Sequence, residues 1–449
     1  MLRNYPSHTH LRNRFAEICS QHVGILESQI FTTLQSVNFP EVQIFTNTMP
    51  QYHKLLISEE AEISYHLSGY GIYKEEGLIR LLGEGIERYA LVLAQTLYKN
   101  RIEYSSYNDI MKKGEVLPFE YMKLYLDNDL EELVALDKFK NIKNITKDDV
   151  IGWIKCPSIF DAGREIYIPA QFLFIGYTTS KEHNDCHFTL GFSKGVASHT
   201  NFKKAFKSAI MEAVEADSSM INWYTKMKCK RVKIDDPTLQ KVISEALGKL
   251  PIEVFPVLMD LPDMPGHTFG LVLINKKNER PFFVMGCQSG LDPVQSLYRA
   301  FLEALGILYL GTYGALFSPQ DFLETSDEKR FINLDSNVSY YADPSNTDEK
   351  LKLLKDMCKG EIALSEIENL SMENDEQEIL YMLKKLRPIS EYGVYLDITP
   401  PETADKGWRV VRTFFPELVQ MSLPDFPYSN HPRIKEYGGI KNKHPHPLP

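Results

Sequence analysis

The sequence has few of the features that mark secreted, membrane or metal-binding proteins. Its six cysteines form no CxxC pair and have no histidine at zinc-finger spacing, so we expect free thiols in a reducing compartment. The first residues contain no apolar segment typical of a signal peptide, and no apolar run approaches the about 18 residues of a membrane span. We therefore predict a cytoplasmic protein that does not insert into a membrane.

The sequence also lacks an excess of positively charged residues. The 50 Lys and Arg residues are outnumbered by 60 Asp and Glu residues, and the formal net charge is -10. Because nucleic acids and anionic membranes bind clustered Lys and Arg, this balance argues against both as general partners. The chain also lacks a P-loop GxxxxGK[ST] and a Rossmann GxGxxG after a strand, so a nucleotide site would have to be built differently.

What remains is the composition of a globular protein, with 43% hydrophobic and 24% charged residues, so disorder is not the default expectation. The 449 residues allow about three domain-sized units or one large α/β domain. Stretches rich in β-formers alternate with helical ones along the chain. This alternation predicts an α/β (α+β) fold in which β-sheets are packed with helices.

Local patterns divide the chain further. The pattern of residues 1–60 predicts an N-terminal segment of helix and strand. Residues 61–449 are predicted to form the main domain. The polar stretch 320–390 predicts a helical excursion, either a docking surface or a solvated one. The end, 445–449, alternates prolines, and such a tail is usually disordered.

Three predicted helices repeat one charged register, and each follows a segment with glycines. Residues three and four apart share a helical face, so each register is a polar stripe opposite an apolar one. A strand, a glycine turn and a helix in this order suit a phosphate site, although a plain tight turn is the alternative. The three registers are Arg80-xxx-Glu84-xx-Glu87, Ser208-xxx-Glu212-xx-Glu215 and Arg299-xxx-Glu303-xx-Gly306, after predicted turns at 68–71, 191–198 and 286–290.

The acidic residues of these helices predict a bound cation if the helices converge. Bare carboxylates brought together would repel one another and protonate, whereas Mg²⁺ binds carboxylates and nucleotide phosphates together. Arginines nearby would bind the remaining phosphate oxygens. The alternative is that the stripes are surface ion pairs on unrelated helices. The residues concerned are Glu84, Glu87, Glu212, Glu215 and Glu303, with Arg80, Arg88 and Arg299.

At these residues the sequence resembles the YcaO family, ATP-dependent enzymes that activate peptide amide bonds. Residues 83–89 resemble the family's first signature SxxxExxER, residues 208–215 the second acidic motif, and residues 299–303 the third, RxxxE. The resemblance extends from about Tyr65 to the C-terminus. The end Pro445-x-Pro447-x-Pro449 is similar to the PxPxP terminus of the azoline-forming subset, so the tail becomes an expected active-site element.

The resemblance implies a YcaO-like fold, with repeated sheet-plus-helix units around a central nucleotide site. Within the family the chain is most similar to the stand-alone D component of streptolysin-S-type toxin clusters. The implied reaction is cyclodehydration, in which a Cys, Ser or Thr side chain of a ribosomally made precursor peptide attacks the preceding carbonyl. ATP phosphorylates the resulting oxygen, and phosphate leaves to give a thiazoline or (methyl)oxazoline. A thioamide-forming relative and a non-catalytic scaffold or leader-binding subunit remain as alternatives.

The same resemblance assigns roles to residues and partners. It implies that the five glutamates hold Mg²⁺ and nucleotide, that Ser208 belongs to the nucleotide site, and that Arg88 and Arg299 bind phosphates. Arg80 stands where the family usually has Ser, and we expect it to replace positive charge that Tyr70 and Ala216 do not supply. The terminal carboxylate of Pro449 is implied to move protons, with Pro445 and Pro447 stiffening the tail. Implied partners are an E1-like leader-binding protein and a flavin-dependent dehydrogenase.

Overall fold

The computed structural model describes most of the chain. The last residues of the predicted N-terminal segment, 58–60, and the start of the predicted excursion, 320–330, lie outside the residues that it describes. Within the described ranges, no helix has the length and apolarity needed to cross a membrane. The ranges are 6–20, 22, 24–27, 31–32, 39–57, 67–317 and 331–449.

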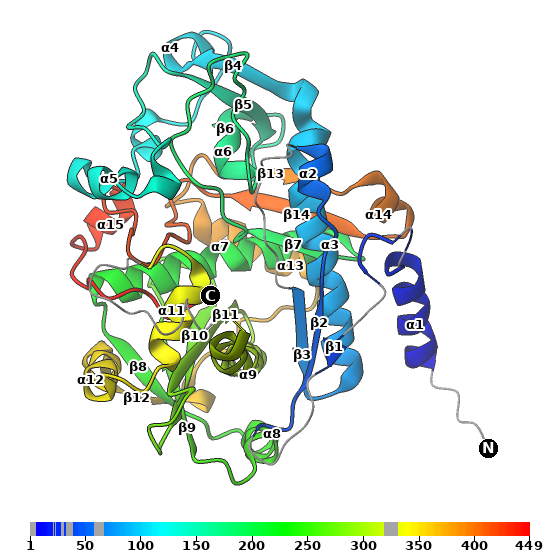
Figure 1. Ribbon diagram of the computed structural model, residues 1–449, viewed down its shortest axis with the longest axis vertical. Coiled ribbons are helices and arrows are strands. Elements are labelled where there is room, and N and C mark those ends of the chain that lie inside the picture. The colour runs from blue at the N-terminus through cyan, green and yellow to red at the C-terminus, as the bar shows by residue number, and fades with distance from the viewer. Residues whose placement is uncertain are drawn as a thin grey trace.

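The strands in these ranges form four sheets, and helices pack between them (Figure 1). Neighbouring strands are antiparallel except β8 and β12, which are parallel. The first sheet is β1 (Phe31–Thr32), β2 (Gln43–Asn47) and β3 (Leu67–Gly71). The largest has the order β11 (Phe283–Gly290), β10 (His267–Asn275), β9 (Ile252–Leu258), β8 (Cys229–Lys233) and β12 (Cys358–Ala363).

The other two sheets have three strands each. One has the order β13 (Val394–Asp397), β14 (Arg409–Phe414) and β7 (Val196–His199), and crosses the middle of the molecule (Figure 1). The other has β4 (Ile102–Ser106), β5 (Val150–Pro157) and β6 (Glu165–Pro169), and lies at one end of the molecule. Shorter helices cover the outside: α1 (Pro6–Ile18), α2 (Tyr52–Leu56), α4 (Tyr107–Ile110), α5 (Asp127–Val134), α8 (Pro237–Leu247), α14 (Pro401–Asp405) and α15 (Pro432–Glu436).

Three long helices confirm the predicted acidic helices: α3 (Lys74–Tyr98), α7 (Phe202–Thr225) and α9 (Pro293–Phe317). The side chain of Asn201 accepts a hydrogen bond from the Lys204 backbone at the start of α7, and left-handed Lys226 ends this helix. The predicted apolar faces are buried, with one exception. Ile79 in the first turns of α3 is 44% exposed, because it lies beside a cavity.

Two of the three predicted glycine turns are wrong, and the third, 191–198, is right only as far as Gly195, because the residues after it belong to β7. Residues 68–71 belong to β3, and residues 286–290 belong to β11. The glycines are needed for close packing, because a Cβ on Gly69 would lie 2.0 Å from the Gly77 carbonyl oxygen of α3. A Cβ on Gly286 would lie 2.3 Å from the Ala300 carbonyl oxygen of α9. In both units glycine lets a helix backbone approach the strand that precedes it.

The three strand-helix units close into a ring. Helix α3 packs on its own strand β3 and on β7, α7 packs on β7 and β11, and α9 packs on β11 and β3. Hydrogen bonds join neighbouring units at two of these junctions. The Ser198 hydroxyl of β7 donates to the Gly83 carbonyl of α3 at 2.7 Å, and Gln288 of β11 donates to Glu215 of α7 at 2.9 Å. The polar stripes of the three helices therefore face a common centre.

The excursion is helical only in part. Helices α11 (Leu334–Ala342), α12 (Thr347–Met357) and α13 (Asp375–Leu386) fit the prediction, but β12 in the same stretch is the edge strand of the largest sheet. The stretch 171–175, rich in β-forming residues, does not form a strand. Proline 169 ends β6, and residues 170–173 form the short helix α6 (Ala170–Leu173), where the buried Gln171 side chain bonds the backbone of Cys186 and Phe188.

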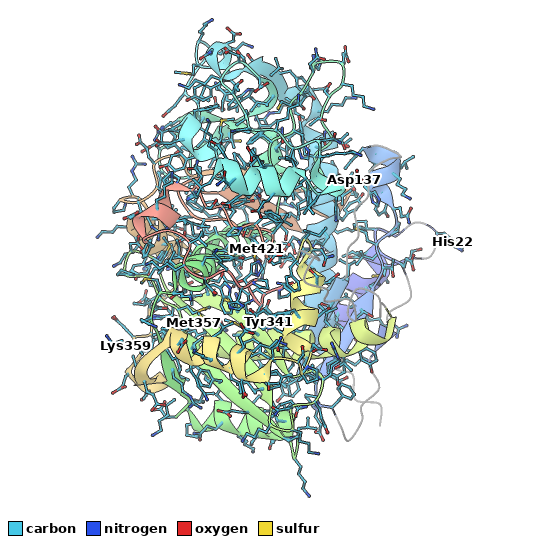
Figure 2. All side chains as sticks on the ribbon, turned by 60° about the vertical axis from the view of Figure 1, so that its left-hand side comes forward. His22, Asp137, Tyr341, Met357, Lys359 and Met421 are labelled. Atoms are coloured by element: carbon cyan, nitrogen blue, oxygen red, sulfur yellow. The ribbon has the colours of Figure 1, made fainter. Side chains whose placement is uncertain are left out.

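The C-terminal tail is ordered inside the molecule, although a tail of alternating prolines is usually disordered. The C-terminus lies near the middle of the view in Figure 1. The Asn337 side chain of α11 donates to the carbonyl oxygens of His446 at 2.6 Å and Leu448 at 2.7 Å. The Tyr341 hydroxyl donates to the carbonyl of Pro445 at 2.7 Å. Tyr341, labelled near the middle of the view in Figure 2, is only 1% exposed.

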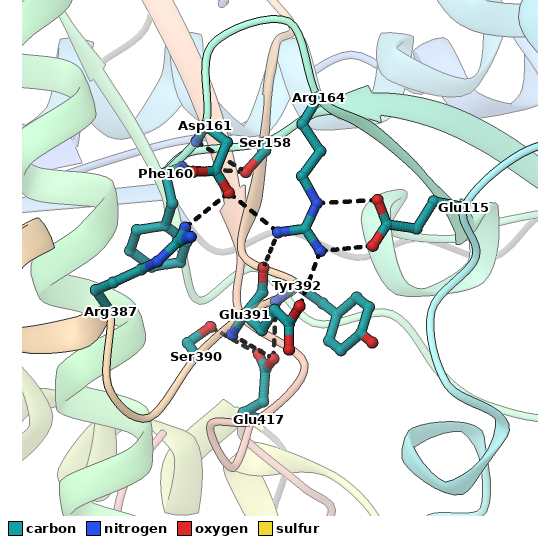
Figure 3. Close-up of polar contacts among 10 residues, drawn as sticks. All are labelled: Glu115, Ser158, Phe160, Asp161, Arg164, Arg387, Ser390, Glu391, Tyr392 and Glu417. Carbon is teal, nitrogen blue, oxygen red and sulfur yellow. Dashed lines mark hydrogen bonds and ion pairs between the residues drawn. The ribbon is translucent and has the colours of Figure 1, made fainter.

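An ion-pair network joins the end sheet to the segment before β13 (Figure 3). Arg164, beside β6, donates to both carboxylate oxygens of Glu115 at 2.9 and 2.5 Å and to Asp161 at 3.1 Å. It also donates to the Glu391 carbonyl at 3.2 Å. Bidentate arginine contacts of this kind fix geometry as well as charge, so the network holds two distant parts of the chain together.

Candidate functional site

A cavity of about 2440 Å³ lies where the three long helices meet. Most of the residues predicted for the site line it, although they come from segments more than 350 residues apart. Three of them do not: Glu215, Pro445 and Pro447. The predicted residues that line the cavity are Arg80, Glu84, Glu87, Arg88, Ser208, Glu212, Arg299, Glu303 and Pro449.

The first glutamate of each register makes the same hydrogen bond. Glu84 accepts from the Ser68 backbone N–H at 3.0 Å, and Glu303 accepts from the Cys287 backbone N–H at 2.7 Å. Glu212 accepts from the Gly195 backbone N–H at 3.3 Å. The donors precede their glutamates by 16, 17 and 16 residues. Each unit therefore orients its carboxylate with a backbone N–H at or beside the preceding strand.

Burial and neighbouring carboxylates raise the pKa values of three glutamates in the cavity. Burial raises the pKa of Glu212 to about 7, and the charge of Glu215 adds to this. Burial and the charge of Glu215 likewise raise the pKa of Glu303 to about 7. Burial and the charge of Glu212 raise the pKa of Glu87 well above its ordinary value. These glutamates are held in an environment that destabilises their charged forms.

Lys194 is a site residue that the sequence analysis missed. It lines the cavity, and its Nζ lies 2.6 Å from Oε1 of Glu215, whose side chain is 4% exposed. Burial acts to lower the pKa of Lys194, but the charges of Glu215, Glu303 and Glu212 outweigh it and hold the pKa well above its ordinary value. The spacing of residues on the helices carries no information about a loop residue such as Lys194. Its position directly before Gly195, in the segment that leads to the second acidic helix, is the sequence feature that could have pointed to it.

Glu215 differs from the other glutamates of the site. Its second oxygen accepts from the Gln288 side chain at 2.9 Å and from the Ser289 backbone N–H at 3.1 Å. With Lys194 on its first oxygen, both oxygens are engaged, and the side chain lies behind Lys194 instead of lining the cavity. In this arrangement Glu215 has no free oxygen for a metal ion.

Arg412 of β14, also missed, fixes the loop that carries Lys194. Its Nη1 donates to the carbonyl oxygens of Phe192 at 2.9 Å, Ser193 at 3.3 Å and Lys194 at 2.8 Å. Its Nη2 donates to the Phe172 carbonyl at 2.7 Å. Burial lowers the pKa of Arg412 to about 10, against the charges of Glu212 and Glu87. No sequence pattern indicates that a strand residue about 220 residues further along the chain reaches this loop.

The three predicted arginines lie in different surroundings. Arg88 lies 3.8 Å from Glu84 and 3.7 Å from Glu87. Arg80 pairs with Glu76 at 3.2 Å, and its guanidinium lies 6.0 Å from the centre of the Tyr70 ring. Arg299 has no ion-pair or hydrogen-bond partner in the described part of the chain, and burial and Arg80 lower its pKa. Arg299 is thus a guanidinium on the cavity wall that an anionic ligand can pair with.

The cavity carboxylates can supply some of the ligands of a Mg²⁺ ion, but they do not form a complete protein site for it. Over the ranges that the structure describes, no three His, Cys, Asp or Glu side chains are arranged to hold a single metal ion. Mg²⁺ in nucleotide sites is commonly held by one or two carboxylates together with phosphate oxygens and water. Glu84, Glu87, Glu212 and Glu303 line the cavity, and Arg88 lies 3.8 Å from Glu84. The residues present therefore fit a Mg-nucleotide.

Comparison with known proteins agrees with these features. The profile of the family described as "YcaO cyclodehydratase, ATP-ad Mg2+-binding" matches residues 68–419. No curated protein matches the chain. Similar solved structures include a heterocyclase in complex with substrate and cofactor, with a TM-score of 0.70 and 16% identity, covering 99% of this chain and 57% of that one. The chain thus spans a little over half of that heterocyclase.

Two shorter structures match over nearly their whole length. YcaO from Methanopyrus kandleri, bound with AMPPCP and Mg²⁺, has a TM-score of 0.60 and 13% identity, covering 99% of this chain and 97% of that one. The E. coli microcin synthetase McbBCD complex with pro-MccB17 bound has a TM-score of 0.61 and 15% identity, covering 94% and 96%. At these identities the structures show a shared fold, which confirms the predicted mixed α/β architecture of sheets packed with helices.

Proposed function

The chain belongs to the YcaO family of ATP- and Mg²⁺-binding cyclodehydratases, and from this we propose that it is an ATP-dependent peptide cyclodehydratase. Its product would be a thiazoline or (methyl)oxazoline formed from Cys, Ser or Thr of a ribosomally made precursor peptide. One observation carries the proposal: Glu84, Glu212 and Glu303 make the same hydrogen bond in three units and line one cavity. A set of unrelated surface stripes would not produce this convergence.

In this proposal the helices share the work of holding a Mg-nucleotide. Mg-ATP would supply the phosphoryl group that turns the amide oxygen into a leaving group. The cavity carboxylates Glu84, Glu87, Glu212 and Glu303 are the candidate metal ligands, with Glu215 behind Lys194. Arg80, Arg88 and Arg299 are the candidate phosphate-binding groups, and neutralising the transferred phosphoryl charge is their main contribution to rate.

The cavity leaves room for a peptide beside the nucleotide. Its volume of about 2440 Å³ exceeds the roughly 300–1,000 Å³ of most small-ligand pockets. Pro449 lines the same cavity, and Asn337 and Tyr341 hold the tail that leads to it. We infer that the terminal carboxylate of Pro449 accepts or donates the proton of the attacking side chain. Pro445 and Pro447, which do not line the cavity, would stiffen the tail.

A similar structure supports a partner for leader recognition. The E. coli microcin synthetase is a McbBCD complex with pro-MccB17 bound. By analogy we propose that a separate E1-like protein binds the leader peptide, and that a flavin-dependent dehydrogenase oxidises azolines in the same complex. We further propose the role of a streptolysin-S-type D component, to which the sequence is most similar within the family, and a location in the cytoplasm, which suits six free cysteines. The PxPxP end at 445–449 supports azoline formation over thioamide formation.

The peptide mass after reaction tests the proposal. The chain is incubated with Mg-ATP, its precursor peptide and the partner proteins encoded with it. Loss of one water mass per modified residue, with release of ADP and phosphate, is the expected result. Replacement of oxygen by sulfur would instead identify a thioamide-forming enzyme. Failure to bind Mg-ATP even with the partners present would identify a scaffold subunit.

A further inference from the structure

Lys194 and Glu215 form a buried ion pair on the wall of the candidate nucleotide site. Lys194 lines the cavity, whereas Glu215 does not. Their atoms lie 2.6 Å apart, and the Glu215 side chain is only 4% exposed. A metal ion can therefore reach the first oxygen of Glu215 only if the ammonium of Lys194 leaves it.

The backbone under Lys194 is fixed, so a change of place must come from its side chain. Arg412 donates to the carbonyl oxygens of residues 192, 193 and 194, and the Gly195 N–H donates to Glu212. Lysine carries its charge on a flexible four-carbon stem, which can turn without movement of the loop. Gln288 and Ser289 hold the second oxygen of Glu215 through bonds that do not involve Lys194.

Comparison of helices α3 and α7 explains why a lysine is needed beside Glu215. In α3 the second glutamate, Glu87, is followed by Arg88, which lies 3.7 Å from it. In α7 the second glutamate, Glu215, is followed by Ala216, so this helix supplies no cation at the same point. Lys194 brings the missing positive charge from the loop before β7.

We propose that Lys194 is a phosphate-binding residue that exchanges places with Mg²⁺ on Glu215 when the nucleotide binds. In the arrangement described, its ammonium neutralises Glu215. When the Mg-nucleotide enters, the ammonium turns into the cavity and pairs with a phosphate oxygen, which leaves Glu215 for the metal. This inference rests on the proposed Mg-nucleotide site and adds a residue and an order of events to it.

The exchange predicts opposite effects on two affinities when the charge of Lys194 is removed. In Lys194→Met, the carboxylates lose their internal cation, so Mn²⁺, used as a spectroscopic probe for Mg²⁺, should bind without nucleotide about tenfold more tightly. The affinity for AMPPCP with Mg²⁺ should fall about tenfold, because one charge-assisted contact is lost. Lys194→Arg should keep the nucleotide affinity within about threefold.

The two affinities are measured by electron paramagnetic resonance of free Mn²⁺ and by calorimetric titration of AMPPCP. Lys207→Met is the matched control, because Lys207 lines the same cavity but pairs with Asp375 and Glu378 at 2.5 Å, and we expect neither affinity to change. If Lys194→Met does not fold, as judged by thermal unfolding, Lys194→Gln keeps a polar contact to Glu215 and answers the same question.

A structural role for Lys194 would give a different pattern. Parallel weakening of both affinities in Lys194→Met, or no change in either, would overturn the exchange while leaving the nucleotide site intact. Absence of AMPPCP binding in the wild-type protein would overturn the proposed function itself. Opposite shifts of the two affinities, with the control unchanged, would support both.

Discussion

The ring of Tyr70 occupies the space that a side chain at Gly306 would need. A Cβ at position 306 would lie 2.9 Å from Cδ1 of Tyr70, at the junction where α9 closes the ring of units against β3. The equivalent positions in the other two helices are Glu87 and Glu215. The third helix therefore supplies one carboxylate instead of two, because the next strand places an aromatic ring there.

Substitution of Gly306 tests this contact. Gly306→Ala should lower the free energy of unfolding relative to Gly83→Ala by at least about 1 kcal/mol, because the new methyl group overpacks against Tyr70. Gly83 is the matched control, since its Cβ would meet only the Ser198 hydroxyl at 3.4 Å, an ordinary contact. Both changes gain the same helix propensity. Equal unfolding free energies for the two variants in a denaturant titration would show that the junction is not tight.

The Glu303 carboxylate should destabilise the protein without Mg²⁺ at pH 8. Burial and Glu215 raise its pKa to about 7, so at pH 8 it is ionised in surroundings that disfavour the charge. Glu303→Gln keeps an acceptor for the Cys287 N–H and removes the charge, so its free energy of unfolding should exceed that of the wild type. Glu253→Gln, in an exposed pair with Arg231, should change it by less than about 1 kcal/mol. A less stable Glu303→Gln would contradict this assignment.

The stability without Mg²⁺ should depend on pH with a defined sign. The pKa values of Glu212 and Glu303 are raised from 4.5 to about 7 in the folded protein. Between these values the folded state binds protons that the unfolded state has lost, so these two groups make stability fall as pH rises from about 4.5 to about 7. Added Mg²⁺ should therefore raise the melting temperature more at pH 8 than at pH 6.

Thermal unfolding at both pH values, with Mg²⁺ or with EDTA, measures this dependence. The Glu212→Gln Glu303→Gln double variant is the control, because it lacks both titrating groups and should lose most of the pH dependence of the Mg²⁺ effect. A Mg²⁺ effect as large at pH 6 as at pH 8 in the wild type would show that these carboxyls do not bind the ion.

The sequence predicted the parts of this site that depend on local spacing. Glu84, Glu212 and Glu303 could be found because a helix repeats every three to four residues and the three registers match. Gly69 and Gly286 led to wrong predictions of turns, because glycine before a helix usually indicates a turn. Both glycines lie in strands, and only the packing of a helix against each strand shows why glycine is needed there. Lys194 and Arg412 reach the site through tertiary contacts, which helix spacing does not show. The tail could be expected at the site only from its resemblance to a PxPxP terminus, because Asn337, which holds it, is about 110 residues away in the sequence.

Removal of Pro449 alone tests the role of the tail. The contacts of Asn337 with the carbonyls of His446 and Leu448 involve residues that remain, so the tail should stay in place. Cyclodehydration, followed by peptide mass, should slow by roughly 100-fold or more, because the terminal carboxylate no longer reaches the reacting groups. AMPPCP affinity should stay unchanged. Full activity of the shortened chain would show that the terminal carboxylate takes no part in the reaction.

The central claim is that the glutamates of three helices form one Mg-nucleotide site, and calorimetric titration with AMPPCP tests it most directly. The titration is carried out with and without Mg²⁺ on the wild type, on Glu212→Gln and on the control Glu253→Gln. The account predicts binding that requires Mg²⁺, is weakened at least about tenfold in Glu212→Gln, and is unchanged in Glu253→Gln. Equal affinity of the wild type and Glu212→Gln, or binding that is indifferent to Mg²⁺, would contradict it.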